Sequence, residues 1–306
     1  MMMMSDRRLL LIFAILAVAP TSAFAKAPGR EPLTLTYLGN AGWQIQDGHT
    51  VIIVDPYVSQ FHDKRLGNPN TSDDGDEVLV PDEAQIAAHI PRADFVVITH
   101  AHSDHMLDAP SVAKGTGAVI IGSEGSAKIA RAEAVPEKQL IIVKGGDDLD
   151  FGRFSLRVIP SLHSHLFAKH YNNSEFSGPV ISGLKAPLHE SAYHEGGTFA
   201  YLLRLAGHRI LIMGSMNYIE REMTGLKPDI ALIGSGSSRT EIYNYSRRLM
   251  KALDNPPIVL PTHWDSYANA TIEKSRSEVR AFSAEINAVS PRTRVIVPEY
   301  FKPMIF

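Results

Sequence analysis

One short segment, His100-Ala101-His102-Ser103-Asp104-His105, places three imidazoles and one carboxylate within six residues. Neutral imidazole nitrogens and carboxylate oxygens are ligands of Zn²⁺ and other divalent transition metals. The apolar run Phe95–Ile98 comes directly before the segment, so we expect these residues to leave the end of a buried strand, where functional sites are often built. In an extended chain His100 and His102 share one face, while Asp104 and the third imidazole follow in a turn and can face a second centre. The sequence therefore predicts a metal site at this strand end.

Two other apolar segments, far away in the sequence, also end in a histidine. Ile159-Pro160-Ser161-Leu162 leads to His163, and Val259-Leu260-Pro261-Thr262 leads to His263. The chain contains no Cys, so thiolate ligands are excluded, and any metal must be held by nitrogen and oxygen. Only the fold can bring these strand ends together.

Composition describes an ordinary folded protein. The chain has 306 residues, of which 44% are hydrophobic and 21% are charged, enough for a sizeable core. The formal net charge of −3 does not favour a nucleic-acid partner, which is usually met by a clustered basic surface. We therefore expect a small-molecule substrate; the oligomeric state cannot be predicted from these features.

The N-terminus resembles a secretory signal. Arg7 and Arg8 form a basic start, residues 9–19 are apolar, and Ala23-Phe24-Ala25 has the small-x-small pattern of a cleavage site. The apolar run is short for a membrane span. We therefore predict a signal peptide over 1–25 and an exported, periplasmic domain over 26–306, without stable membrane insertion once the signal is removed. An uncleaved N-terminal anchor is the alternative.

Strand and helix patterns alternate through both halves of the chain. Polar stretches at 59–82 and 166–196 are predicted to be loops, and the second has the length of a lid or binding segment. The alternation predicts two sheets covered by helices, with no linker that divides domains. Strands are expected over 33–37, 43–45, 51–54, 95–99, 118–121, 140–143, 154–159, 198–205, 209–213, 229–233, 258–260 and 294–297, and helices over 81–90, 126–134, 243–253 and 275–287.

The H-x-H-x-D-H pattern over 100–105, followed in order by His163 and His263, resembles the metallo-β-lactamase superfamily. The resemblance runs from about Leu33 to the C-terminus. Tyr37–Gly42 and Ile53–Tyr57 are similar to the branch that contains ascorbate-phosphate lactonase-like hydrolases. The resemblance implies a single-domain α/β fold, an αββα four-layer sandwich with one or two metals at one edge.

The same resemblance implies the ligands. One metal would be held by His100, His102 and His163, and a second by Asp104, His105 and His263. Zn²⁺ suits this donor set, with one or two ions, and iron or manganese is the alternative. Asp55 is expected to orient a ligand through a hydrogen bond. Most hydrolases of the family carry an Asp that bridges both metals, and Ser215 stands at that position here, which should weaken the second site.

These features predict an exported metal-dependent hydrolase that uses a metal-activated hydroxide on an ester, lactone, amide or phosphodiester. Asp104 is the candidate catalytic residue, because it can return a proton to the leaving group. The alternatives are a β-lactam hydrolase, a non-catalytic metal-binding protein with a decayed second site, and an iron redox enzyme of the same fold. Candidate substrate contacts are His165, His170, Tyr171, His194 and Trp264.

Overall fold

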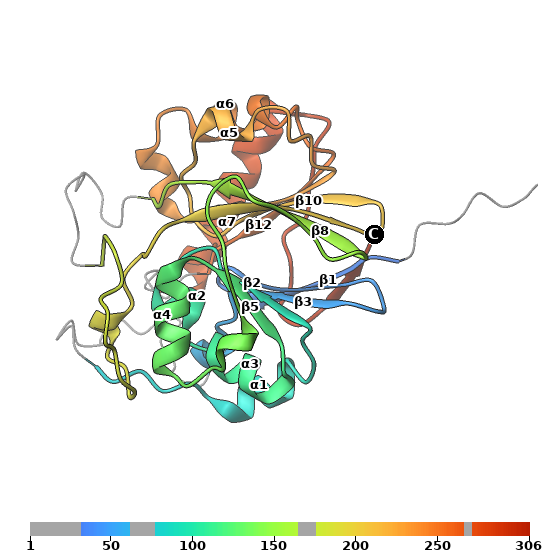
Figure 1. Cartoon of the computed structure of the whole chain (residues 1–306). Helices are drawn as coiled ribbons and strands as arrows, with labels where there is room; N and C mark the ends of the chain where they lie inside the picture. The colour runs from blue at the N-terminus through green and yellow to red at the C-terminus, as the bar shows by residue number, and fades with distance from the viewer. Residues whose placement is uncertain (1–31, 62–76, 165–175, 266–270) are drawn as a thin grey trace, which may run out of the picture. The chain divides into compact units, whose positions relative to one another are not determined.

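Two mixed seven-stranded sheets pack face to face, and helices cover the outer face of each (Figure 1). The computed structural model describes residues 32–61, 77–164, 176–265 and 271–306. The predicted signal peptide over 1–25 lies outside the described residues. The four layers are those of the predicted αββα sandwich, so the fold class is confirmed.

The first sheet has the order β14-β1-β2-β3-β4-β5-β6. Strands β3 to β6 run parallel, so their carboxyl ends meet at one edge. Its strands are β1 (Thr34–Gly39), β2 (Gly42–Gln46), β3 (Val51–Val54), β4 (Phe95–Val97), β5 (Val119–Gly122), β6 (Leu140–Ile142) and β14 (Pro303–Ile305). The helices on this side are η1 (Val58–Phe61), α1 (Glu83–His89), α2 (Ser103–Met106), α3 (Ala109–Thr116), α4 (Glu124–Ala132) and η2 (Glu137–Gln139).

The second sheet has the order β13-β12-β11-β10-β9-β8-β7. Strands β8, β10, β11 and β12 point in the same direction, so their carboxyl ends also share one edge. Its strands are β7 (Asp148–Asp150), β8 (Phe154–Pro160), β9 (Phe199–Leu205), β10 (His208–Met213), β11 (Ile230–Gly234), β12 (Ile258–Thr262) and β13 (Arg294–Val295). The remaining helices are η3 (Glu190–Ala192), α5 (Glu220–Met223), η4 (Ser237–Glu241), α6 (Tyr245–Ala252) and α7 (Ile272–Val289).

The central strands are apolar on both faces, as expected for strands buried between a second sheet and a layer of helices. In β10, Ile210 and Ile212 join the core between the two sheets, whereas Leu211 and Met213 join the core under the helices α5 to α7. Because successive side chains of a strand point to opposite faces, β10 packs against the first sheet on one side and against the helices on the other.

The two sheets meet at the edge where the parallel strands end. Tyr201 of β9 donates its hydroxyl to the carbonyl of Ile98 at 2.7 Å, and the N–H of Phe199 donates to the carbonyl of Thr99 at 2.8 Å. The segment that follows β4 is therefore held beside the start of β9.

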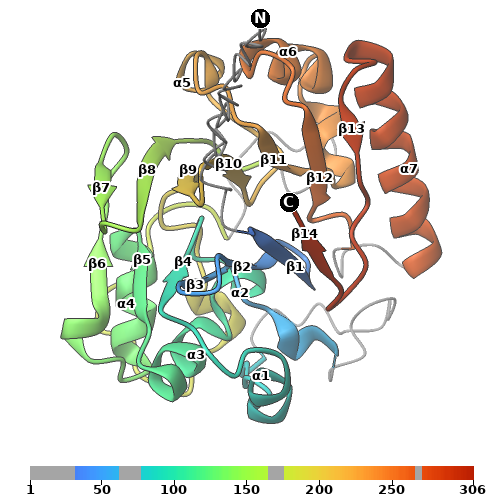
Figure 2. The ribbon, with the colours of Figure 1, turned by 90° about the vertical axis from the view of Figure 1, so that its right-hand side faces the viewer.

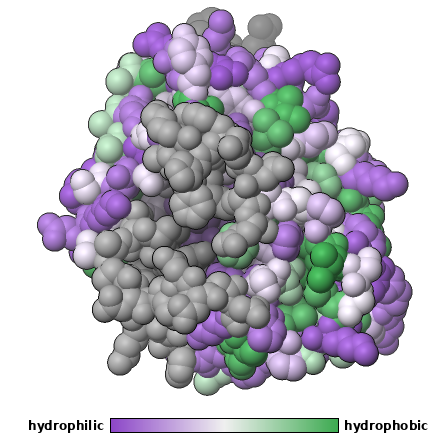
Figure 3. All heavy atoms as spheres, turned by 90° about the vertical axis from the view of Figure 1, so that its left-hand side faces the viewer, coloured by the Kyte–Doolittle hydropathy of each residue, from purple (hydrophilic) through white to green (hydrophobic). Residues whose placement is uncertain are grey.

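The C-terminal strand completes the first sheet. Figure 2 shows β14 beside β1, and the register pairs Leu35 with Met304. On the face seen in Figure 3, hydrophobic side chains of the described residues form small separate groups among hydrophilic ones. Within the described part of the chain, no helix is both long and apolar enough to cross a membrane.

A buried carboxylate ties η1 to the start of α3. Asp108 is fully buried, and its two oxygens accept the N–H of Ser59 at 3.0 Å and the Ser59 hydroxyl at 2.5 Å. Burial raises the pKa of Asp108 to about 7, although the hydrogen bonds from Ser59 oppose the shift. The native state therefore holds a proton here that the unfolded chain releases at lower pH.

This linkage predicts a pH-dependent stability. The folded pKa lies above the unfolded one, so the free energy of unfolding should fall as pH rises from about 4 to about 7, by at most about 1.4 kcal/mol per pH unit. Above that range the contribution of Asp108 should be constant. Urea unfolding of wild-type protein and of Asp108→Asn at several pH values measures this dependence. The contributions of the other titratable groups are shared by both proteins and cancel when the two free energies are subtracted. A difference between the two proteins that does not change with pH would contradict the assignment.

Candidate metal centre

The loop after β4 carries four of the six predicted ligands. The Thr99 N–H donates to Asp55 Oδ1 at 2.8 Å, which fixes the chain where it leaves the strand. His100 follows in a loop, His102 has extended backbone, and the one-turn helix α2 then begins, carrying Asp104 and His105. The predicted strand, loop and turn are therefore all present in this segment.

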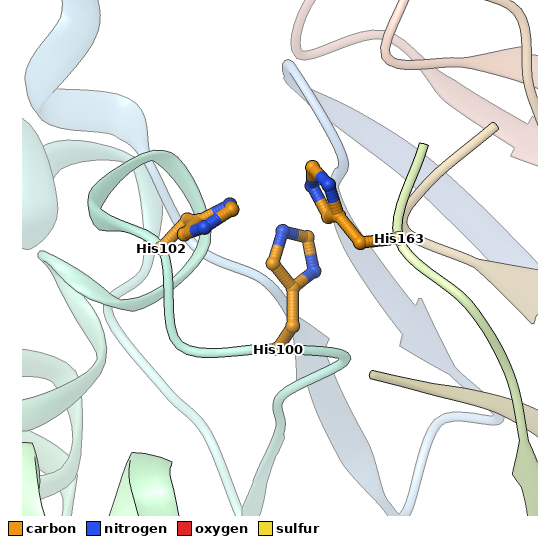
Figure 4. Close-up of side chains that lie close together, drawn as sticks. All are labelled: His100, His102 and His163. Carbon is orange, nitrogen blue, oxygen red and sulfur yellow. The ribbon is translucent and has the colours of Figure 1, made fainter. Parts of the chain in front are cut away.

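Three imidazoles from two sheets face one another. His163 follows β8 of the second sheet, and Figure 4 shows its ring pointing toward His100 and His102. Ring centroids are 4.8 Å apart for His100 and His102, 4.7 Å for His100 and His163, and 4.6 Å for His102 and His163. One nitrogen of each lies within 4.8 Å of the other two, a spacing that can surround a single metal ion.

A second group lies next to the first. Asp104 Oδ2 is 3.5 Å from His105 Nε2 and 3.2 Å from His263 Nε2. The rings of His100 and His105 are 3.9 Å apart between centroids, so the two groups are neighbours. His263 comes from the end of β12, as the sequence predicts. The structure thus brings all six predicted ligands together at one edge of the sandwich.

A hydrogen bond fixes the ring of each of three histidines. Asp55 Oδ2 lies 2.8 Å from His105 Nδ1, the carbonyl of Ser164 lies 2.7 Å from His163 Nδ1, and the carbonyl of Phe176 lies 3.0 Å from His102 Nε2. Each acceptor favours a proton on the nitrogen that it contacts, which leaves the other nitrogen as a lone-pair donor.

Three ring nitrogens of these histidines are buried without a hydrogen-bond partner. Among the described residues, His100 Nε2 and His105 Nε2 are buried and have no hydrogen-bond partner, and the same holds for His263 Nδ1. A buried polar atom without a partner costs about 1–3 kcal/mol. Several such atoms in one pocket are explained by a ligand that they share.

The local electrostatics match cation binding. Burial, reinforced by the neighbouring imidazoles, holds the pKa of His100 and His163 well below the ordinary value. For Asp104, burial acts upward, but the charge of His105 and the hydrogen bond from His263 outweigh it and hold the pKa well below its usual range. Burial lowers the pKa of His105, yet Asp104 and Asp55 raise it overall. Neutral imidazoles at His100 and His163 and an ionised Asp104 are the protonation states that bind metals, whereas His105 would release a proton on binding one.

Three non-glycine residues at the pocket have left-handed backbone. Asn40, Asp55 and His263 have φ angles of 52°, 38° and 55°, in the left-handed region that costs a non-glycine residue about 1–2 kcal/mol. Asp55 and His263 each follow a strand directly, so the turn aims their side chains into the pocket. Residues held in such conformations often lie at functional sites.

Ser215, at the predicted bridging position, forms a hydrogen bond to the main chain. The Ser215 hydroxyl is buried and accepts the N–H of Ser164 at 2.9 Å.

His194 is half-buried, with its Nδ1 3.1 Å from the carbonyl of Ser177. Trp264 is only 4% exposed and stacks on Tyr37 with centroids 6.0 Å apart, so its ring packs in the core. Of the predicted substrate contacts, His165, His170 and Tyr171 lie outside the described residues.

Other contacts at the pocket were not predicted. Asn40 Nδ2 donates to the carbonyl of Asp104 at 2.8 Å and lies 3.2 Å from its Oδ2. The backbone N–H of Asn40 donates to Asp265, which is fully buried and also accepts the Tyr37 hydroxyl. The Phe176 carbonyl that orients His102 also went unpredicted, since backbone groups leave no mark in a sequence pattern.

Comparison with known proteins agrees with this geometry. The chain is 26% identical over 242 residues to a UPF0173 metal-dependent hydrolase of Heliobacterium modesticaldum, covering 77% of this chain and 84% of the relative. The fold is similar to Igni18, a metallo hydrolase from Ignicoccus hospitalis, with a TM-score of 0.59 and 18% identity over 90% of this chain and 98% of that one.

The fold is also similar to CmlA, a diiron beta-hydroxylase from Streptomyces venezuelae, with a TM-score of 0.52 and 14% identity over 91% of this chain and 55% of CmlA. The family model described as the beta-lactamase superfamily domain matches residues 34–263, which is well over half the chain. With the αββα fold and the cluster at its edge, this match shows that the chain belongs to the metallo-β-lactamase superfamily.

Proposed function

We propose that this protein is an exported, metal-dependent hydrolase of a small-molecule ester, lactone, amide or phosphodiester. The observation that carries the proposal is the group of imidazoles from both sheets, His100, His102 and His163, whose ring nitrogens lie within 4.8 Å of one another. The relatives named metal-dependent hydrolases support the reaction class. Export rests on the basic and apolar N-terminal residues alone, and the likeness to the ascorbate-phosphate lactonase branch stays a prediction.

His100, His102 and His163 are the proposed ligands of a first ion, and Asp104, His105 and His263 those of a second. We favour Zn²⁺, because a set of imidazoles and one carboxylate without thiolates suits it. A bound divalent cation would lower the pKa of a coordinated water to about 7, which makes a nucleophile available near neutral pH.

The side chains of this protein would do the remaining work. Asp104 is held ionised among imidazoles, which is the state that binds a cation. It stays the candidate for returning a proton to the leaving group. Asn40 fixes this carboxylate through its side-chain amide. Asp55 orients His105, and its second oxygen anchors Thr99 at the base of the loop.

The experiment that tests the function is a substrate panel on metal-loaded protein. The panel contains an aryl ester, a γ-lactone, an anilide, bis(p-nitrophenyl) phosphate and a chromogenic cephalosporin. We expect metal-dependent turnover of at least one class, lost after treatment with a chelator and restored by added Zn²⁺. Turnover of the cephalosporin alone would favour a β-lactam hydrolase. Full metal content without any turnover would favour the non-catalytic alternative, and oxygen-dependent activity with iron would favour a redox enzyme.

The ligand assignment predicts the effect of His163→Ala. Metal affinity should fall by at least about 100-fold and activity should be lost, because one of three donors is removed. Far-ultraviolet circular dichroism should be unchanged, since His163 lies on a loop. The control is His208→Ala, which removes a buried imidazole at the start of β10, the end of that strand away from the pocket. Unchanged metal affinity in His163→Ala would contradict the assignment.

The role of Asp55 predicts a graded loss. Asp55→Asn keeps a residue that tolerates left-handed backbone, but it weakens the acceptor that orients His105. Metal affinity should fall about 10- to 100-fold. Asp47→Asn is the control, because Asp47 is also buried and accepts two backbone N–H groups, but in the turn before β3, away from the pocket. Metal affinity is measured by competition with a chromogenic chelator. Equal metal affinities of wild type and Asp55→Asn would contradict the role of Asp55 in orienting His105.

A further inference from the structure

We infer that the segment Gly214–Asn217, which follows β10, positions His163 relative to His100, and that Ser215 and Asn217 are positioning residues. The inference rests on the proposed metal-dependent function, because it assigns these residues a role in holding one ligand of the proposed site. It also gives the hydroxyl at position 215 a purpose other than binding a metal.

Side chains of this segment hold the main chain on both sides of the His163 ring. The Ser215 hydroxyl accepts the N–H of Ser164 at 2.9 Å, and Asn217 Nδ2 donates to the carbonyl of His163 at 3.1 Å. The Ser161 hydroxyl donates in return to the carbonyl of Asn217 at 3.3 Å. The loop from Ser161 to Ser164, which follows β8, is thereby tied at three points to residues that follow β10, the next strand but one in the sheet.

The same contacts determine how the imidazole is turned. His163 Nδ1 lies 2.7 Å from the carbonyl of Ser164, the residue whose N–H is held by Ser215. Since Nδ1 takes part in this bond, Nε2 is the nitrogen left to face His100 and His102. Ser215 therefore acts on the ring through Ser164, without contacting the ring itself.

The other end of the segment is packed against the loop that carries His100. A Cβ atom on Gly214 would lie 2.0 Å from Thr99 Oγ1 and 2.7 Å from Asp55 Oδ2, so only glycine fits. Thr99 Oγ1 in turn lies 3.1 Å from His100 Nδ1. One short stretch of chain thus touches the support of His100 on one side and the support of His163 on the other, and sets the spacing between ligands that come from different sheets.

The side chains of Ser215 and Asn217 form hydrogen bonds that a substitution would remove. Ser215 is 4% exposed, so removal of its hydroxyl would leave the buried N–H of Ser164 without a partner. Asn217 uses both ends of its amide, because Oδ1 accepts the N–H of Tyr218 at 2.9 Å. An Asp at 217 would keep that acceptor, but it would place a second oxygen against the carbonyl of His163.

The test measures Co²⁺ affinity and the d–d spectrum of Ser215→Ala and Asn217→Asp. Each variant should bind Co²⁺ about 10- to 100-fold more weakly than wild type, with an altered spectrum, since the orientation of a ligand is relaxed. In a His163→Ala background, Ser215→Ala should have no further effect, because it acts through His163. Ser290→Ala is the matched control: Ser290 is equally buried, and it lies at the end of α7, near the start of β12, away from the pocket.

Hydrogen exchange of the metal-free protein provides an independent readout. Exchange of the Ser164 amide should be at least about tenfold faster in Ser215→Ala than in wild type, and unchanged in Ser290→Ala. Wild-type affinity and exchange in Ser215→Ala would overturn the inference, and so would an equal loss of affinity in the His163→Ala background. If wild-type protein binds no Co²⁺, the proposed function fails, while the exchange rates still decide whether Ser215 holds this loop.

Discussion

The structure depends on one constraint, which is that four buried imidazoles, a half-buried one and two buried carboxylates share a single pocket where two apolar sheets meet. Polar groups taken out of water lose several kcal/mol unless they find partners. Here Asp55, Ser164 and Phe176 provide fixed acceptors for one nitrogen of a ring, but the opposite nitrogens are left facing one another. A pocket of this kind is stable only with a scaffold that keeps the rings from turning away.

The scaffold consists of parallel strands whose carboxyl ends point at the pocket from both sheets. Because the central strands are buried on both faces, they cannot slide by one residue without exposing an entire apolar side. The loops are then tied across the sheets, by Tyr201 to Ile98 and by Phe199 to Thr99. Left-handed backbone at Asp55 and His263 is tolerated because this framework determines the path of the chain around it.

Apolar patterns predicted the strands well, because burial on both faces leaves a continuous run that sequence displays directly. The strand over 51–54 has the predicted bounds, and the hairpin of β9 and β10 agrees within one residue at each end. Helix α3 was missed, since Pro110 and Gly115 interrupt its short helical pattern. Strand β14 was also missed, because its three residues are specified by pairing with β1 and not by their own composition.

The ligand-type residues were predictable for a similar reason, since six His and Asp side chains at strand ends stand out among apolar neighbours. Residues that support them do not stand out. The role of Asn40 depends on its contact with Asp104, and the hydrogen bond of Ser215 depends on a main-chain N–H of Ser164. Such contacts are set by tertiary structure, and a hydroxyl or an amide in a loop has many equally ordinary uses.

The net charge of the pocket depends on the residue at position 215. The carboxylates of Asp55 and Asp104 together carry two negative charges, which one divalent cation neutralises when every imidazole is neutral. A second divalent cation would leave an excess of two positive charges in a buried pocket, where uncompensated charge is costly. A carboxylate at 215 would reduce that excess, whereas the serine cannot. If these residues hold metal as proposed, the charge balance agrees with the prediction that the serine weakens the second position.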